Sequence, residues 1–160
     1  MPTTFLSSLG VQFDIPAVVR EIVRFIKVDP KRKYKVIIGT DSQQSGAANP
    51  DFVTAIVVHR VGNGGIYFFR RHELKRFHTL RDRIIREVLI SLEVAEKVLT
   101  ELNLHAKEVS WDFEIHADVG ENGPTSALIQ EVTGIIRASN FTVKTKPDSY
   151  AASKVADRHV

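Results

Sequence analysis

The order of the expected elements along the chain is the feature that most constrains its fold. Three β-rich segments follow one another at residues 33–40, 51–61 and 65–73, and Gly-Asn-Gly-Gly between the last two marks a hairpin. Strands and helices then alternate through the rest of the sequence. Three meandering strands followed by this alternation predict an α/β fold, with a mixed five-stranded sheet and helices on both of its faces.

Apolar periodicity predicts the elements that surround this meander. A helix at 15–28, with Asp14 as N-cap and Pro16 in its first turn, precedes the first strand. Five elements are expected after the hairpin: a helix from Leu80 to about Leu102, a strand over 108–118, a helix over 123–139 that Pro124 opens, a strand over 141–147 and a short helix over 149–159. We expect one domain over 1–160, with residues 1–30 as an N-terminal helical extension.

Composition excludes several classes of protein. The 160 residues are 43% apolar, which suits one globular domain with a buried core. The sequence has no cysteine, so disulfides and thiolate chemistry are excluded. It has no apolar run of about 18 residues that would span a membrane. The N-terminus lacks the pattern of a signal peptide, so a cytoplasmic protein is expected.

Basic residues gather in three clusters, although the net charge is only +3. The clusters lie at 29–35, 69–78 and 81–86. Such clusters indicate a polyanionic partner such as nucleic acid. The alternative is a solvated surface balanced by nearby acids, so charge alone does not identify the partner.

Two aspartates stand where buried strands end. Asp41 follows the apolar run in "VIIGTDSQQSG", and Asp118 ends the fourth strand in "FEIHADVGENG". If these strands are parallel neighbours, their separation of about 4.8 Å would bring both carboxylates within reach of one metal ion. Two carboxylates that close repel each other unless a cation lies between them, and Mg²⁺ prefers oxygen ligands. The alternative for Asp41 is that it caps a turn.

A third acid is expected from the long helix. Glu87 lies at the rim of its apolar face, whereas Glu93 points nearly opposite to that face. The alternative is that Glu87 lies on the surface as an i,i+4 partner of Arg83 or Ser91. A fourth candidate is Asp157, which taken alone is an acid near a frayed terminus.

The sequence resembles the ribonuclease H-like superfamily in its full topological order, and most closely the bacterial YkuK-type family of nuclease-like proteins. The resemblance is carried by "GTDSQ", the hairpin, the helix with Glu87, "IHADVG" and "KPDSYAASKVADRH". It covers nearly the whole chain. It implies a ribonuclease H-like fold and a metal-dependent nuclease that acts on RNA, RNA/DNA hybrid or structured DNA.

The resemblance also implies roles for individual residues. Two divalent ions, Mg²⁺ or Mn²⁺, would be held by four catalytic acids: Asp41, Glu87, Asp118 and Asp157. Phosphate or strand contacts are expected from a further set: Ser42, Gln43, Lys31, Arg32, Arg70, Arg71 and Lys75. His159 is a candidate proton shuttle, with an exposed terminal histidine as the alternative.

Some features depart from the superfamily's pattern. Gln43 stands where the proofreading-exonuclease branch has a Glu, so that branch is disfavoured. The sequence ends three residues after Asp157, and a mobile Asp157 would weaken the second metal site. Three alternatives to a nuclease therefore stay open: an inactive nucleic-acid-binding module, a protein-interaction module, and nucleotide binding at "ADVGENGPTS".

Overall fold

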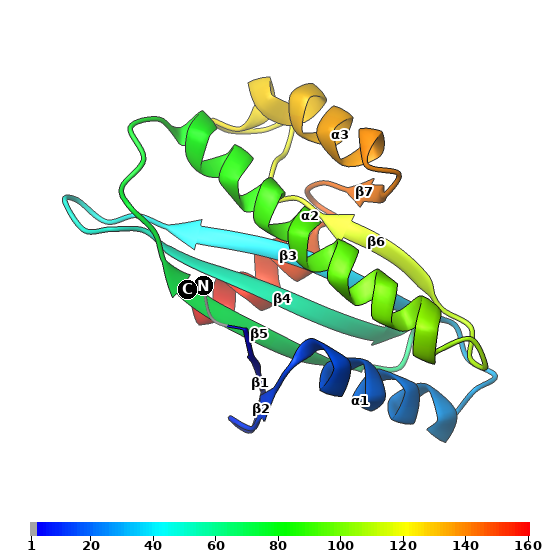
Figure 1. Ribbon diagram of the computed structural model, residues 1–160. Helices are drawn as coiled ribbons and strands as arrows, with labels where there is room; N and C mark the ends of the chain where they lie inside the picture. The colour runs from blue at the N-terminus through cyan, green and yellow to red at the C-terminus, as the bar shows by residue number, and fades with distance from the viewer. Residues whose placement is uncertain (1–2) are drawn as a thin grey trace.

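The computed structural model describes residues 3–160, and in them a seven-stranded mixed sheet forms the centre of the molecule (Figure 1). The strand order is β2-β1-β5-β4-β3-β6-β7. The strands are β1 (Phe5–Ser7), β2 (Gln12–Phe13), β3 (Tyr34–Gln43), β4 (Asp51–Arg60), β5 (Gly65–Glu73), β6 (Asp112–His116) and β7 (Thr142–Lys144). The predicted α/β class with a mixed sheet is confirmed.

The topology follows the predicted order, with one addition. Strands β3, β4 and β5 form the antiparallel meander, β6 lies parallel to β3, and β7 lies parallel to β6. The expected count of five strands was too low, because β1 and β2 extend the sheet beyond β5. These strands have three and two residues, too few for an alternating pattern to be recognised in the sequence.

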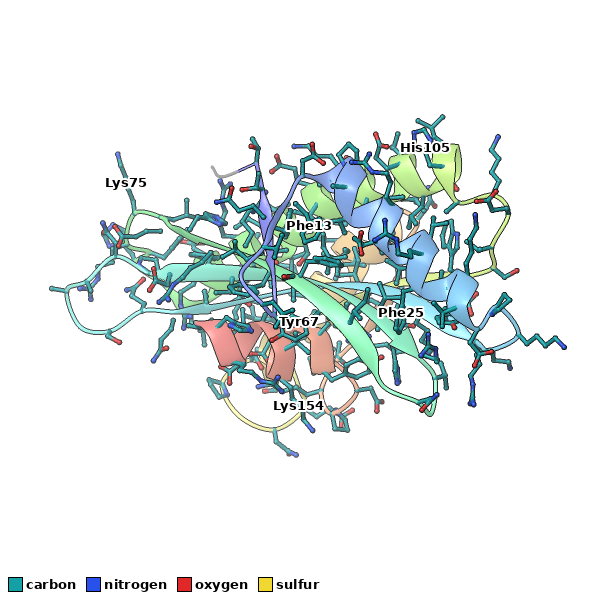
Figure 2. All side chains as sticks on the ribbon, turned by 90° about the horizontal axis from the view of Figure 1, so that it is seen from below. Phe13, Phe25, Tyr67, Lys75, His105 and Lys154 are labelled. Atoms are coloured by element: carbon teal, nitrogen blue, oxygen red, sulfur yellow. The ribbon has the colours of Figure 1, made fainter. Side chains whose placement is uncertain are left out.

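Helices cover both faces of the sheet (Figures 1 and 2). One face carries α1 (Ile15–Val28), α2 (Leu80–His105) and α3 (Ile129–Ala138), the last after a 3₁₀ turn, η1 (Ser126–Leu128). The other face carries a π-helix, η2 (Ala151–Ala156), and a 3₁₀ turn, η3 (Asp157–His159). We call η2 and η3 together the C-terminal helical segment.

The helix boundaries confirm some local predictions and correct others. Asp14 caps α1 by accepting a hydrogen bond of 2.8 Å from the Ala17 backbone N–H, as expected. The third predicted helix begins later than residue 123, so Pro124 is not in its first turn. Gly123 before it has a positive φ of 95°, which breaks the helical path.

The core has two parts, one on each face of the sheet. The larger part packs α1, α2 and α3 against the sheet. The smaller part lies under the C-terminal helical segment and is formed by six buried residues: Ile37, Val53, Ala55, Val57, Ala151 and Ala156.

Gly39 lets the C-terminal helical segment lie directly on the sheet. A Cβ atom on Gly39 would lie 2.5 Å from the backbone nitrogen of Ala152 and 2.7 Å from the carbonyl carbon of Ala151. Only glycine therefore permits this close approach of two backbones. The approach brings the last residues of the chain over the middle of β3, two residues before Asp41.

Within residues 3–160, none of the helices combines the length and the apolar character needed to cross a lipid bilayer.

Candidate active site

Parallel pairing of β3 with β6 brings Asp41 and Asp118 to the same end of the sheet. Gly39 pairs with His116 in this ladder. Asp41 and Asp118 each lie two residues further on, and both strands run in the same direction. The condition on which the sequence argument depended, that these two strands are parallel neighbours, is confirmed.

Glu87 reaches the same end of β3 from helix α2. Arg83, Glu87 and Ser91 are spaced by four residues and form a polar stripe on the helix. Every fourth residue of a helix recurs after about 6 Å, close to the repeat of about 6.7 Å between alternate strand residues. The stripe therefore matches Thr40 and Ser42 of β3.

Hydrogen bonds join this stripe to β3. The Ser42 hydroxyl donates to Oε2 of Glu87 at 2.5 Å, and Thr40 Oγ1 lies 2.7 Å from Ser91 Oγ. Nη1 of Arg83 donates to the Ser42 carbonyl at 2.9 Å and to its hydroxyl oxygen at 2.8 Å. Glu87 is only 3% exposed, so the alternative of a surface glutamate is wrong, and the side chain lies deeper than the expected rim position.

Asp157 comes from η3 of the C-terminal helical segment. Its carboxyl group lies near that of Asp41 and helps to raise the pKa of Asp41. Asp157 is exposed, whereas Asp41 is 6% exposed. The fourth candidate acid therefore lies beside the first, held there by the packing of η2 on β3.

Burial and mutual repulsion raise the pKa values of the two inner acids. Burial raises the pKa of Asp41 to about 8, and the contact with Asp157 and the charge of Asp118 act in the same direction. Burial, followed by the charge of Asp41, raises the pKa of Glu87 well above its ordinary range. Without a cation, burial therefore favours the protonated forms of both carboxyl groups.

Asp118 has a different environment, with two polar partners. Its Oδ1 accepts a hydrogen bond of 2.7 Å from the Ser153 hydroxyl and lies 3.2 Å from Nζ of Lys146. Ser153 Oγ lies 2.7 Å from Ser149 Oγ. The side chain of Asp118 is 18% exposed. This acid is therefore ion-paired and partly accessible to solvent.

A buried Glu114–His116 pair anchors the C-terminal helical segment. Nδ1 of His116 accepts the Ala151 backbone N–H at 3.1 Å, so Nε2 carries the ring hydrogen and donates to Glu114 Oε1 at 2.8 Å. The hydrogen bond from His116 lowers the pKa of Glu114. Sequence reasoning missed this pair, although Glu114, His116 and Asp118 alternate in "EIHAD" and so share one face of β6.

The comparison with known families agrees with this geometry. A sequence model described as Ribonuclease H-like matches residues 17–160. The chain belongs to the ribonuclease H-like family. It is 36% identical over 164 residues to a Bacillus subtilis (strain 168) protein named "Uncharacterized protein YkuK", covering 96% of this chain and 95% of that one. The search of solved structures gave no significant match.

The residues expected to bind substrate are spread over several parts of the ribonuclease H-like fold. Gln43, beside the acids, is exposed, whereas the hydroxyl of Ser42 is occupied by Glu87 and Arg83. Lys31 and Arg32 are exposed but precede β3, at the end of that strand opposite to Asp41.

The basic residues of β5 and the loop after it also differ from one another. Arg70 is 7% exposed, with its guanidinium 5.0 Å from the centre of the Phe5 ring, so the structure buries it rather than presenting it to solvent. Arg71 is ion-paired with Asp51 at 2.7 Å. Lys75 is exposed, and Figure 2 shows Lys75 and Lys154 projecting from opposite sides of the sheet.

His159 packs on β5. Its ring stacks on Phe69 at 3.8 Å between centroids, and its Nε2 lies 3.0 Å from the Tyr67 hydroxyl. Tyr67 lies beside the C-terminal helical segment in Figure 2. These contacts tie the chain end to the sheet, so the alternative of a freely exposed terminal histidine is wrong. The shuttle role stays a prediction.

The donor set has the chemistry that a divalent cation requires. Across residues 3–160, no three or more His, Asp or Glu side chains are arranged to hold a metal ion as they lie. The acids nevertheless act on one another electrostatically at the end of β3, and all of them are oxygen donors. Oδ1 of Asp118 already contacts Lys146 and Ser153, which would compete with a cation for this carboxylate.

Proposed function

We propose that this protein is a Mg²⁺- or Mn²⁺-dependent nuclease that hydrolyses phosphodiester bonds in RNA, RNA/DNA hybrid or structured DNA. The observation that carries the proposal is the parallel pairing of β3 with β6, which brings Asp41 and Asp118 to one end of the sheet, near Glu87 and Asp157. Neighbouring negative charges contribute to the raised pKa values of Asp41 and Glu87, and a bound cation would offset that repulsion. Membership of the ribonuclease H-like family supports the same reaction.

The four acids would share the binding of two divalent ions. Asp41 and Asp118, from adjacent parallel strands, are the proposed primary ligands, with Glu87 at the first ion and Asp157 at the second. When bound, the ions would lower the pKa of a water molecule and stabilise the leaving oxygen. Ser42 holds the Glu87 carboxyl in place, and Arg83 fixes Ser42 from the same helix. Gln43 and Lys75 are proposed to contact the nucleic acid.

A binding module without turnover is the second candidate. It is favoured by the present arrangement of Asp118, whose Oδ1 is satisfied by Ser153 and Lys146. Such a module would bind nucleic acid or a partner protein through its basic surface, and its affinity for nucleic acid would fall steeply with salt.

Cleavage of labelled RNA, RNA/DNA hybrid and branched DNA in Mn²⁺ tests the nuclease. We expect Asp41→Asn and Asp118→Asn each to lower the rate at least about 100-fold, the scale of losing one charge that stabilises the transition state. Asp112→Asn is the matched control, because Asp112 is exposed and lies at the opposite end of β6. Activity that persists in both site variants would refute the assigned site. Salt-sensitive binding without cleavage of any substrate would favour the binding module.

A further inference from the structure

Lys146 is a cation held beside the acids by the backbone. Its N–H donates to the Val119 carbonyl at 2.8 Å, which extends the pairing of β6 with β7. Its side chain lies on Gly120, where an added Cβ atom would meet the Lys146 Cβ at 2.9 Å. A glycine at that position therefore lets the lysine stem lie flat against the strand end, with its ammonium group at Asp118.

The same lysine borders a cavity. Gly120, Glu121, Asn122, Lys146 and Pro147 line this space of about 420 Å³. The Lys146 side chain is 46% exposed, so a ligand in the cavity could reach its ammonium group while that group contacts Asp118. An ammonium group on a flexible four-carbon stem is a point charge that binds phosphate oxygens without a fixed direction.

Lys146 and a divalent cation would compete for one carboxylate group. Nζ of Lys146 lies 3.2 Å from Oδ1 of Asp118, the side chain that the proposed function gives to the metal as a ligand. Two cations beside the same carboxylate repel each other, so binding of one weakens binding of the other.

We propose that Lys146 exchanges partners: it neutralises Asp118 while the divalent ion is absent, and binds a phosphate of the nucleic acid in the adjacent cavity once the ion occupies Asp118. This inference rests on the proposed function, and it assigns the cavity to the nucleotide next to the bond that is cut. It predicts that Lys146→Met raises the affinity for Mn²⁺ and lowers the affinity for RNA.

Titration with Mn²⁺ alone, followed by calorimetry, tests the first half. We expect Lys146→Met to bind Mn²⁺ about two- to fivefold more tightly than the wild type, the factor expected for loss of a partly exposed ion pair. Lys107→Met is the control, because Lys107 is exposed and precedes β6 at the end opposite to Asp118.

Binding of a labelled 12-nucleotide RNA in Ca²⁺, followed by fluorescence anisotropy over a series of salt concentrations, tests the second half. Loss of one phosphate contact predicts weaker binding by Lys146→Met and a salt slope smaller by about 0.7, as for one single-strand contact. If Lys146→Met changes the affinities for Mn²⁺ and RNA in the same direction, or changes neither, the exchange is wrong and the nuclease proposal still stands. A wild-type protein that takes up no Mn²⁺ overturns both.

Discussion

The site has a buried half and an exposed half, and they are built differently. Asp41 lies on β3 and Glu87 on the longest helix, α2, and both are more than nine-tenths buried. Asp118 and Asp157 lie after the end of β6 and in the C-terminal helical segment, where solvent reaches them. Regular secondary structure positions Asp41 and Glu87. The positions of Asp118 and Asp157 depend on how the segment after β6 and the C-terminal helical segment pack against the sheet.

Because of this difference, the negative charge is neutralised in different ways in the two halves of the site. Burial favours the protonated forms of the inner carboxyl groups, Asp41 and Glu87, when no cation is present. Lys146 and Ser153 hold Asp118 from outside. On the proposed function, a cation would compete with protons in one half and with Lys146 and Ser153 in the other. We therefore expect its affinity to depend on pH and on the position of the C-terminal helical segment.

Displacing the C-terminal helical segment should have the largest effect on stability and should disrupt the exposed half of the site. Gly39→Val places side-chain atoms where the backbone of Ala151 and Ala152 now lies. We expect the free energy of unfolding in urea to fall by about 3 kcal/mol or more, since overpacking against backbone cannot be relieved by a rotamer change. Mn²⁺ affinity should fall as well, because Asp157 leaves the site.

Gly134→Ala is the matched control for that substitution. Gly134 lies in α3, and nothing is within 4 Å of an added Cβ atom. Alanine there should stabilise the protein by about 0.5–1 kcal/mol. If Gly39→Val were as well tolerated as this control, the close approach of η2 to β3 would be wrong.

The pH dependence of stability tests the buried half. The pKa of Asp41 rises from an ordinary value of about 3.9 to about 8 on folding, so the folded state binds a proton that the unfolded state releases. The free energy of unfolding of the metal-free protein should therefore fall by about 2 kcal/mol or more as pH rises from 5 to 8. Thermal or urea unfolding at several pH values measures it.

Asp41→Asn and added Mn²⁺ give two controls for this pH dependence. The asparagine variant should show a shallower decline with pH, with the remainder due to Glu87. Mn²⁺ binds the deprotonated carboxylates, so its stabilisation of the wild type should be greater at pH 8 than at pH 6. An unchanged slope in Asp41→Asn would mean that this carboxyl group ionises normally.

Removing the anchor of the C-terminal helical segment gives a smaller effect. His116→Ala removes the acceptor of the Ala151 N–H and the hydrogen-bond donor of buried Glu114, which keeps the Lys35 ammonium group at 3.8 Å. We expect the free energy of unfolding to fall by about 2 kcal/mol. Hydrogen exchange should speed up at Ala151 before it does in α1 or α2. Uniform acceleration over the whole chain would show that His116 has no specific link to this segment.

The positions of Asp41, Glu87 and Asp118 were largely predictable from the sequence, whereas the anchoring of Asp157 and the burial of Arg70 were not. Asp41 stands at the end of an apolar strand, and helical spacing separated Glu87 from the other glutamates of α2. The burial of Arg70 could not be read from a basic cluster, because the short strand β1 that covers it has no periodicity. The anchoring of Asp157 depends on Gly39 and His116, which meet the chain end only in three dimensions.

Diffraction from a crystal soaked in MnCl₂ at pH 8 tests the central claim most directly. We expect an anomalous difference peak at the end of β3, within coordination distance of carboxylate oxygens of Asp41 and Asp118, with Lys146 moved away from Asp118. No peak at millimolar Mn²⁺, or a peak bound by neither aspartate, would contradict it.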